Sequence, residues 1–380
     1  MRLLHTSDWH LGKRLFKLDR SEEHALFLNW LIETLIRENI DVLLIAGDIF
    51  DTPTPPHQSL ELFYRFLHRV STETKAQTLI IAGNHDSGVL LEAPSQILAM
   101  HRVKVWGKLS PRPSDHWLSI RRGEEKLDIC AIPFFRSYEL LPQGEGDILQ
   151  ALGRYLTLER SGPQLLMLHH LAGLYEAAGS EQVISLSGID SIPAAILKSF
   201  DYVALGHIHK PQKIGPNCYY SGSPLPMRFS ETLKKSLVLL ELKDNQITSS
   251  ILPLPVFRDL VSIKANGENY VEKLRSIEKS GTLTPVVEVQ LSLSAPRVGV
   301  IDHIKQLLEE KEMELLSFLP VYPQAEKKHK RHEKLFELSP LELFEEFYAA
   351  KYPDAEVLPV ELEHDFRALL EKVKHASAPT

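Results

Sequence analysis

The sequence predicts a layered α/β sandwich followed by a smaller α+β domain. Its first 255 residues repeat one arrangement, in which a short run rich in Leu, Ile and Val ends on polar residues and is often followed by an amphipathic segment. These runs are continuously apolar instead of alternating, which is typical of strands buried on both faces. Sheets of this kind need helices or a second sheet against each face, so a layered fold is expected.

Six apolar runs are predicted to be strands of the first domain. They are RLLHTSD (2–8), DVLLIAGD (41–48), QTLIIAGN (77–84), KLDICAIPF (126–134), QLLMLHH (164–170) and DYVALGH (201–207). Two intervening segments, 21–38 and 57–70, carry apolar residues on one helical face. This spacing predicts two amphipathic helices that cover the sheet.

Prolines interrupt this pattern near 251–260 (ILPLPVFRDL), which indicates that the first domain spans 1–255. A strand, helix and strand pattern follows, with a further amphipathic helix near 299–311, and predicts a small α+β capping domain over 256–325. Residues 326–380 are expected to form a linker and C-terminal amphipathic helices.

The C-terminal segment begins with the basic run KKHKRHEK (327–334), which is interpreted as a solvated link because charge runs of this length are usually solvated. The run could alternatively contact DNA phosphates. Ser339 is expected to cap a helix with Pro340 at its first position and Glu342 completing a capping box. A last helix is expected after Pro359.

Both C-terminal helices carry an apolar stripe. The first stripe consists of Leu341, Phe344, Phe347 and Tyr348, and the second of Leu362, Phe366, Leu369, Leu370 and Val373. These stripes either pack on their own domain or cover a helical partner. The spacing alone leaves both interpretations open.

Composition limits the classes of partner and compartment. The net charge of −7 argues against a broad basic surface, so any contact with nucleic acid must be local, metal-assisted or shared with a partner. Cys130 and Cys218 lack metal or redox spacing, which suits a reducing compartment. Neither a signal sequence nor an apolar run of about 18 residues is found, so a cytoplasmic protein without a membrane span is expected.

Polar side chains able to bind a metal gather just past the predicted strands. They are Asp8, His10, Asp48, Asn84, His85, His207, His209 and one member of the doublet His169-His170. Functional groups of layered α/β folds gather at the carboxyl ends of their strands. Pairs two residues apart, such as those near the first and sixth strands, point to the same side. We therefore expect one site.

The ligand types favour two metal ions and phosphate chemistry. Carboxylate, amide and imidazole donors without thiolates suit Mn(II), Fe(II) or Zn(II). Their number exceeds what one ion needs, so two ions are expected, with the central Asp48 as the bridge. Two ions roughly 3.5–4 Å apart can bind a phosphate ester for hydrolysis. His85 is the candidate acid for the leaving group, and the adjacent Asp86 would orient or charge it.

Each of these residues also has a structural interpretation. A lone His after a strand is commonly a hydrogen-bonding residue, and a lone Asp there is commonly a helix cap. Glycines at 47, 83 and 206 fit either turns or room for metals. Five such sites at the same topological place favour the metal centre.

The ordered motifs DWHLG, GDIFD, GNHD and GHIH, with a His-bearing strand end between the last two, resemble the calcineurin-like metallophosphoesterases. HTSDWHLG, AGDIFDTPTPP, IAGNHDSG, DYVALGHIHKPQ, YSGSPLP and SPLELFEEFY resemble more narrowly the SbcD family, the nuclease component of the bacterial SbcCD complex. The resemblance spans the chain and is least specific over 258–335. It implies an α/β/β/α metallophosphoesterase sandwich and a metal-dependent nuclease, a hydrolase of phosphoric ester bonds.

The resemblance also implies roles for single residues. One manganese ion would be held by Asp8, His10, Asp48 and His209. The other would be held by Asp48, Asn84, His169 and His207. His85 would be the catalytic histidine beside the phosphate. The family shows a single His where this chain has His169-His170, and counting forward without gaps favours His169.

A substrate and partners follow from the same resemblance. SbcD-like proteins cut DNA as a homodimer within a heterotetramer with SbcC, a coiled-coil ATPase. Their action in DNA repair, recombination and replication is an ATP-dependent exonuclease on duplex ends and an endonuclease on hairpins or single strands. ATP would bind the partner, because this chain has no G-x-x-x-x-G-K-[ST] loop. The segment KRLFKLDR (13–20) is placed for contacts with DNA or within the dimer.

Two other functions fit parts of the sequence. A stand-alone metallophosphatase or phosphodiesterase acting on small substrates would need the same metal ligands but has little use for residues 256–380. A non-catalytic scaffold would be expected to have lost ligands, yet every expected ligand is present. The nuclease therefore ranks first.

Overall fold

The computed structural model describes most of the chain, namely residues 1–141, 146–157, 162–173, 175–180, 192–231, 234–322, 340–351, 359, 362–363 and 366–367. The chain divides into two compact units. The first consists of Met1–Ile263, Val271–Val289 and Ile301–Phe318. The second consists of the described parts of Lys264–Tyr270, Gln290–Val300 and Leu319–Thr380.

The first unit contains a six-stranded sheet built around the start of the chain. Its order is β14 (Gln246–Pro253), β13 (Ser236–Lys243), β1 (Arg2–Thr6), β4 (Val42–Ala46), β5 (Gln77–Ile81) and β6 (Val103–Trp106). The strands β1, β4, β5 and β6 are parallel, while β13 is antiparallel to both β1 and β14. The carboxyl ends of β1, β4 and β5 therefore meet at one edge.

A second six-stranded sheet packs against the first. Its order is β11 (Gln212–Lys213), β12 (Cys218–Tyr220), β10 (Tyr202–Gly206), β9 (Gln164–His169), β8 (Glu125–Ile132) and β7 (Trp117–Arg122). The strands β12, β10, β9 and β8 are parallel, and the short β11 and β7 form antiparallel edges.

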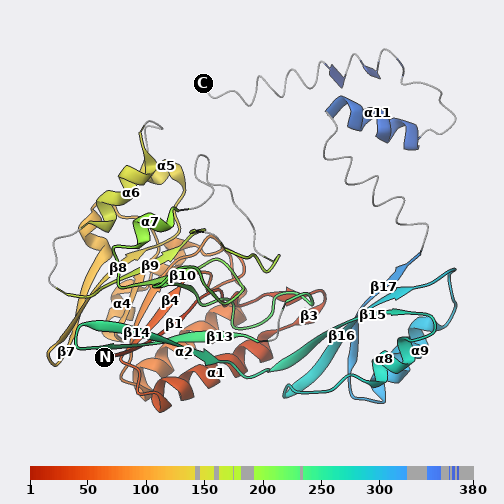
Figure 1. Cartoon of the computed structure of the whole chain (residues 1–380), viewed down its shortest axis with the longest axis horizontal. Helices are drawn as coiled ribbons and strands as arrows, with labels where there is room; N and C mark the ends of the chain where they lie inside the picture. The colour runs from red at the N-terminus through yellow and green to blue at the C-terminus, as the bar shows by residue number, and fades with distance from the viewer. Residues whose placement is uncertain are drawn as a thin grey trace. The chain divides into compact units, whose positions relative to one another are not determined.

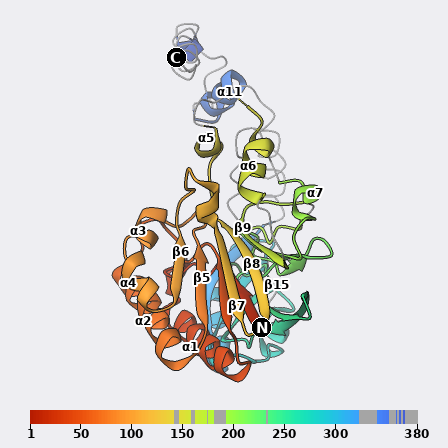
Figure 2. The same ribbon diagram turned by 90° about the vertical axis from the view of Figure 1, so that its left-hand side faces the viewer.

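Helices complete the layers on the outer faces of both sheets. On the first sheet, α1 (Ser21–Arg37) and α2 (His57–Glu73) bury Phe27 and Phe63. A second apolar cluster, which includes Leu44 and Met167, fills the space between the sheets. On the second sheet, α6 (Ile148–Leu156) and α7 (Ala194–Leu197) cover a third cluster. Figures 1 and 2 show these α/β/β/α layers, which confirm the predicted fold class.

All six predicted strands are present, as β1, β4, β5, β8, β9 and β10, and both predicted helices are confirmed. The second helix extends to Glu73, three residues beyond its predicted end. Shorter elements that the sequence did not single out lie between them. They are β2 (Arg14–Leu15), β3 (Leu18–Asp19), α3 (Gly88–Glu92), α4 (Ser95–Met100), η1 (Pro113–His116) and α5 (Ser137–Leu140).

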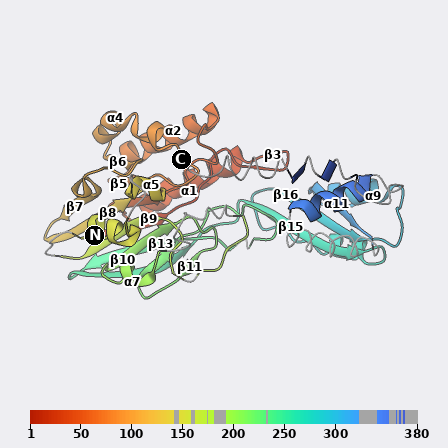
Figure 3. The same cartoon turned by 90° about the horizontal axis from the view of Figure 1, so that it is seen from above.

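After the strands of the sandwich, three further strands form a sheet of their own with two helices, shown in Figures 1 and 3. The strands are β15 (Arg258–Asn266), β16 (Leu283–Ser292) and β17 (Glu314–Val321), and the helices are α8 (Tyr270–Arg275) and α9 (Val300–Glu309). The predicted strand, helix, strand and helix are therefore present. The third strand, β17, is an addition.

The C-terminal helix α11 (Pro340–Lys351) begins where the sequence predicts it. Ser339 and the run 327–334 lie outside the described residues, as do Leu369, Leu370 and Val373. The described Phe344 and Phe366, one from each predicted stripe, stack with ring centroids 4.1 Å apart. Among the described residues, no helix combines the length and apolar character needed to cross a membrane.

Candidate metal centre

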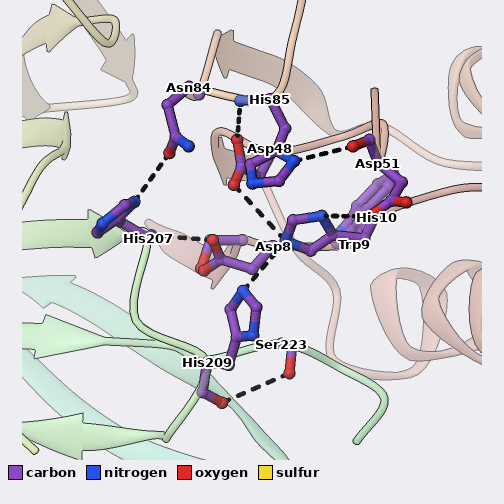
Figure 4. A network of polar contacts seen from close by, with 12 residues as sticks. Asp8, Trp9, His10, Asp48, Asp51, Asn84, His85, His207, His209 and Ser223 are labelled. Atoms are coloured by element: carbon purple, nitrogen blue, oxygen red, sulfur yellow. Dashed lines mark hydrogen bonds and ion pairs between the residues drawn. The ribbon is translucent and has the colours of Figure 1, made fainter. Parts of the chain in front are cut away.

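The predicted ligands come together where strands of both sheets end. In the first sheet, Asp8 and His10 follow β1, Asp48 follows β4, and Asn84 and His85 follow β5. In the second sheet, His169 ends β9, and His207 and His209 lie in the turn after β10. The backbone N–H of His207 donates to Asp8 Oδ1 at 2.9 Å, which ties the two sheets together at this point. Figure 4 shows these side chains, other than that of His169, converging.

Four of these residues have left-handed backbone conformations. The φ angles are 55° at Asp8, 48° at His10, 51° at Asp48 and 98° at His207. Such conformations cost about 1–3 kcal/mol each in non-glycine residues and persist only where surrounding contacts enforce them. Here the N–H of Asp8 donates to Gly47 O and that of His10 to Asp48 O, each at 3.0 Å. Strain of this kind is concentrated at functional sites.

Three overlapping clusters of ligand atoms make up the centre. Within each cluster the atoms lie within 4.8 Å of one another. The clusters are Asp8, His10 and His209; Asp8, Asp48 and His169; and His10, Asp51 and His85. Because Asp8 and His10 are shared, the clusters form one continuous centre.

Asn84 and His207 complete one side of this centre. The Asn84 Oδ1 atom lies 2.8 Å from His207 Nδ1 and 3.1 Å from His169 Nε2. On the other side, His10 Nε2 lies 3.1 Å from His209 Nε2. Every residue that the sequence predicts as a ligand therefore lies in one place.

The charges of the centre are strongly coupled. Burial raises the pKa of the Asp8 carboxyl to about 7, an effect that the Asp48 charge adds to and His169 opposes. Burial alone would also raise the pKa of Asp48, but the neighbouring His169 holds that pKa well below its usual range. In turn the Asp48 charge overcomes burial and raises the pKa of His169 to about 9.

These donors fit divalent metal ions. Two buried carboxylates lie beside several imidazole nitrogens, and no thiolate takes part. At the edge of the centre, Asp51 Oδ1 lies 3.4 Å from His10 Nδ1 and 3.0 Å from Lys13 Nζ. Divalent cations would compensate the carboxylates and bind the ring nitrogens that face one another, as mixed oxygen and nitrogen sites do.

The two members of the histidine doublet face opposite ways. His169 donates through Nδ1 to Ala46 O at 2.7 Å and presents Nε2 to the centre, 3.4 Å from Asp48 Oδ1. His170 instead accepts the Phe135 N–H at 3.3 Å, and its ring centroid lies 4.2 Å from that of Phe135. The strand alternation explains the difference, and His169 is the member whose ring faces the other predicted ligands.

His85 takes its orientation from a residue that the sequence did not single out. Its Nδ1 lies 2.8 Å from Asp51 O, and the Asp51 carboxylate lies 3.4 Å from His10 Nδ1. Asp51 is the last residue of the GDIFD motif, which was its only sequence signal. The Asp86 carboxylate points elsewhere, because it accepts hydrogen bonds from the backbone N–H groups of Gly83, Ile49 and Phe50.

Comparison with known proteins shows the family to which this chain is similar. The model of the calcineurin-like phosphoesterase family matches residues 1–211, more than half of the chain. The SbcD component of the nuclease SbcCD from Escherichia coli (strain K12) is 30% identical over 370 residues, which cover 90% of this chain and 92% of that protein. The protein of the same name from Rhodobacter capsulatus is 35% identical over 284 residues, covering 67% and 70%.

The chain belongs to the SbcD family of nucleases. The relative from Bacillus subtilis is 32% identical over 268 residues, which cover 65% of this chain and 67% of the relative. As a member of this family with a metallophosphoesterase domain, the chain is a metal-dependent hydrolase of the nuclease class.

A second family model matches a C-terminal part of the chain. The type 5 capsule protein repressor C-terminal domain matches residues 256–352. This match begins just before β15 and ends just after α11. The family thus accounts for the α+β region and the C-terminal helix as well as for the sandwich.

Proposed function

We propose that this chain is the catalytic component of a two-metal DNA nuclease. One ion would be held by Asp8, His10, Asp48 and His209. The second would be held by Asp48, Asn84, His169 and His207, with Mn²⁺ as the metal in both sites. When bound, two such ions would bind the phosphodiester and lower the pKa of the attacking water.

The observation that carries this proposal is the position of Asp48 between two groups of ligands. Its Oδ2 lies 3.5 Å from His10 Nε2, and its Oδ1 lies 3.4 Å from His169 Nε2. The two oxygens of one buried carboxylate thus face the two proposed ligand groups. The same Oδ1 accepts the backbone N–H of His85 at 2.9 Å, which fixes the carboxylate and places His85 beside it.

His85 is the proposed general acid. Its Nδ1–H can donate to Asp51 O, which leaves Nε2 for the substrate. Unlike the buried aspartate and histidine ligands, His85 is half-buried and so accessible to a phosphodiester. As the phosphorus–oxygen bond to the leaving group breaks, the protonated imidazole would transfer its Nε2 proton to that oxygen. Asp86 supports this step indirectly, because it fixes the loop that carries His85.

The hairpin of β2 and β3 is the proposed contact with the DNA backbone. Lys13, just before β2, places Nζ 3.0 Å from Asp51 Oδ1 at the edge of the centre. Arg14 and Lys17 follow, and Phe16 at the turn is 60% exposed. Basic side chains beside the centre would bind phosphates locally, as a chain with a net charge of −7 requires.

The partner in this proposal is an SbcC-type coiled-coil ATPase, bound by a homodimer of this chain within a heterotetramer. The relatives are named as components of the nuclease SbcCD, which supports the partner. Phe347 of α11 is 60% exposed and offers an apolar contact in the proposed partner-binding region, 326–380. That region would follow a nuclease domain over 1–255 and a capping domain over 256–325.

With the partner and ATP, the proposed activities are exonuclease cleavage of duplex ends and endonuclease cleavage of hairpins or single strands. DNA repair, recombination and replication are the processes that such activities serve. The cytoplasm is the proposed compartment, which agrees with Cys130 and Cys218 both being free thiols.

The test is digestion of end-labelled linear duplex and hairpin DNA across a Mn²⁺ titration, with and without the partner ATPase and ATP. We expect metal-dependent cleavage that His85→Ala lowers by about 10²–10⁴-fold, while Mn²⁺ binding is retained. His101→Ala, an exposed histidine outside the centre, is the matched control. Activity on a phosphate monoester without DNA cleavage in any mixture would contradict the proposal and favour a stand-alone phosphatase.

A further inference from the structure

The proposed ligand His209 is held from behind by three polar side chains. Its Nδ1 lies 2.6 Å from Ser180 Oγ. Ser180 Oγ also donates to Glu231 Oε1, and Glu231 Oε2 accepts from Lys235 Nζ at 2.7 Å. Glu231 and Lys235 are buried, although both carry charge. Burying an ion pair costs desolvation free energy, so the position of this pair behind a proposed metal ligand suggests a function beyond stability.

The hydrogen bonds from His209 through Ser180 to Glu231 have only one possible direction. An ionised carboxylate accepts and never donates, so the Ser180 hydroxyl must give its proton to Glu231. Ser180 Oγ is then the acceptor for His209 Nδ1–H. A neutral imidazole carries one N–H, so its lone pair is left on Nε2. That nitrogen lies 3.1 Å from His10 Nε2, in the cluster that also contains Asp8.

Glu231 reaches His209 only through the serine. The distance from His209 Nδ1 to Glu231 Oε1 is 4.0 Å, which is too long for a hydrogen bond. Ser180 lies in the segment 175–180 after β9, whereas Glu231 and Lys235 precede β13. The fold therefore brings two separate segments together behind one imidazole.

Lys235 holds both the carboxylate and the backbone of His209. Its Nζ donates to His209 O at 3.1 Å and to Ser223 Oγ at 2.9 Å, as well as to Glu231. The N–H of Ser223 donates to the same His209 carbonyl at 3.1 Å. The main chain and the imidazole of His209 are thus fixed by one network.

We propose that Ser180, Glu231 and Lys235 are positioning residues that fix the His209 tautomer and thereby set the affinity of one of the two metal sites. The affected site is the one assigned to Asp8, His10, Asp48 and His209. This inference rests on the proposed role of His209 as a ligand and is independent of the DNA substrate. Partners of this kind behind a ligating histidine typically change metal affinity by about 10–100-fold.

The test is calorimetric titration of the metal-free full chain with Mn²⁺, together with its unfolding temperature. Ser180→Ala and Glu231→Gln are expected to weaken one of two sites by about 10–100-fold and to leave the other unchanged. Ser180→Thr keeps the hydroxyl and is expected to restore the weakened site. Ser199→Ala removes an exposed serine far from the centre and is the control.

Two outcomes would overturn the inference. One is an unchanged affinity of both metal sites in Ser180→Ala. If Glu231→Gln does not fold, the result for Ser180→Ala alone tests the inference. The other is an equal weakening of both sites with a lower unfolding temperature, which indicates a merely structural role. A wild-type chain that binds fewer than two Mn²⁺ ions, or His209→Ala that keeps both sites intact, would instead refute the proposed metal centre itself.

Discussion

Gly206, at the end of β10, lies against Ala46 at the end of β4, and Gly206→Ala tests how closely the two sheets pack at the centre. It pairs with His169 across β10 and β9. A Cβ atom at this position would lie 1.9 Å from Ala46 O and 2.6 Å from His169 Nδ1. These are the two atoms whose hydrogen bond orients His169. An alanine side chain would therefore force apart the carbonyl and the imidazole.

The size of the effect follows from these distances. Real Cβ atoms essentially never approach another heavy atom within 3.0 Å. Because close-packed interiors have no spare room, β10 must move away from β4 by about 1 Å. Overpacking of this kind lowers the free energy of unfolding by about 1–3 kcal/mol. A displacement of about 1 Å at a positioned group lowers kcat by about 100-fold.

Urea denaturation would measure the stability loss of Gly206→Ala, and cleavage of end-labelled DNA at saturating Mn²⁺ would measure kcat. Gly153→Ala is the matched control, because a Cβ there meets nothing within 4 Å. Gly153 lies within α6, so alanine should stabilise the chain by about 0.5–1 kcal/mol. Wild-type stability and a wild-type rate for Gly206→Ala would refute the argument.

Further predictions concern charge and hydrogen bonding. Glu23→Gln removes the carboxylate that pairs with the buried Arg20 and Arg258, and should cost about 3–5 kcal/mol in urea denaturation; a loss below about 1 kcal/mol would contradict this. Without metal, the Asp48 charge overcomes burial to raise the pKa of His169 to about 9, and burial raises that of Asp8 to about 7, so Mn²⁺ binding at neutral pH should release between about one and two protons. The affinity for Mn²⁺ should rise with pH until about 9. Calorimetry in buffers of different ionisation enthalpy would measure the protons released, and an affinity that does not change with pH would contradict the prediction. Asp86→Ala leaves the backbone N–H groups of Gly83, Ile49 and Phe50 without an acceptor, and should lower the free energy of unfolding by about 1–3 kcal/mol for each group. Thermal unfolding should show a larger loss for Asp86→Ala than for Asp86→Asn.

The sequence predicted the sandwich and the place of the centre because both follow from local patterns. Continuous apolar runs fixed the six inner strands, and the polar residues just past them had to meet once the strands ran parallel. The edge hairpin of β13 and β14 was less visible. Its turn consists of Asp244 and Asn245, both with positive φ, and its outer strand is largely exposed.

The remaining features depend on contacts between distant segments. Ser180 and Glu231 acquire a role only when the fold places them behind His209. Asp86 was predicted to be a partner of His85 because it is adjacent in sequence, but its carboxylate accepts hydrogen bonds from backbone N–H groups of two turns. Hydrogen-bond partners of this kind are set by tertiary geometry, which residue spacing does not encode.

The measurement that tests the two-metal account most directly is anomalous diffraction from crystals of the chain grown with Mn²⁺. The account predicts two manganese peaks on either side of the Asp48 carboxylate, one against His10 and His209 and the other against Asn84, His169 and His207. A single peak, or two peaks without Asp48 between them, would contradict it.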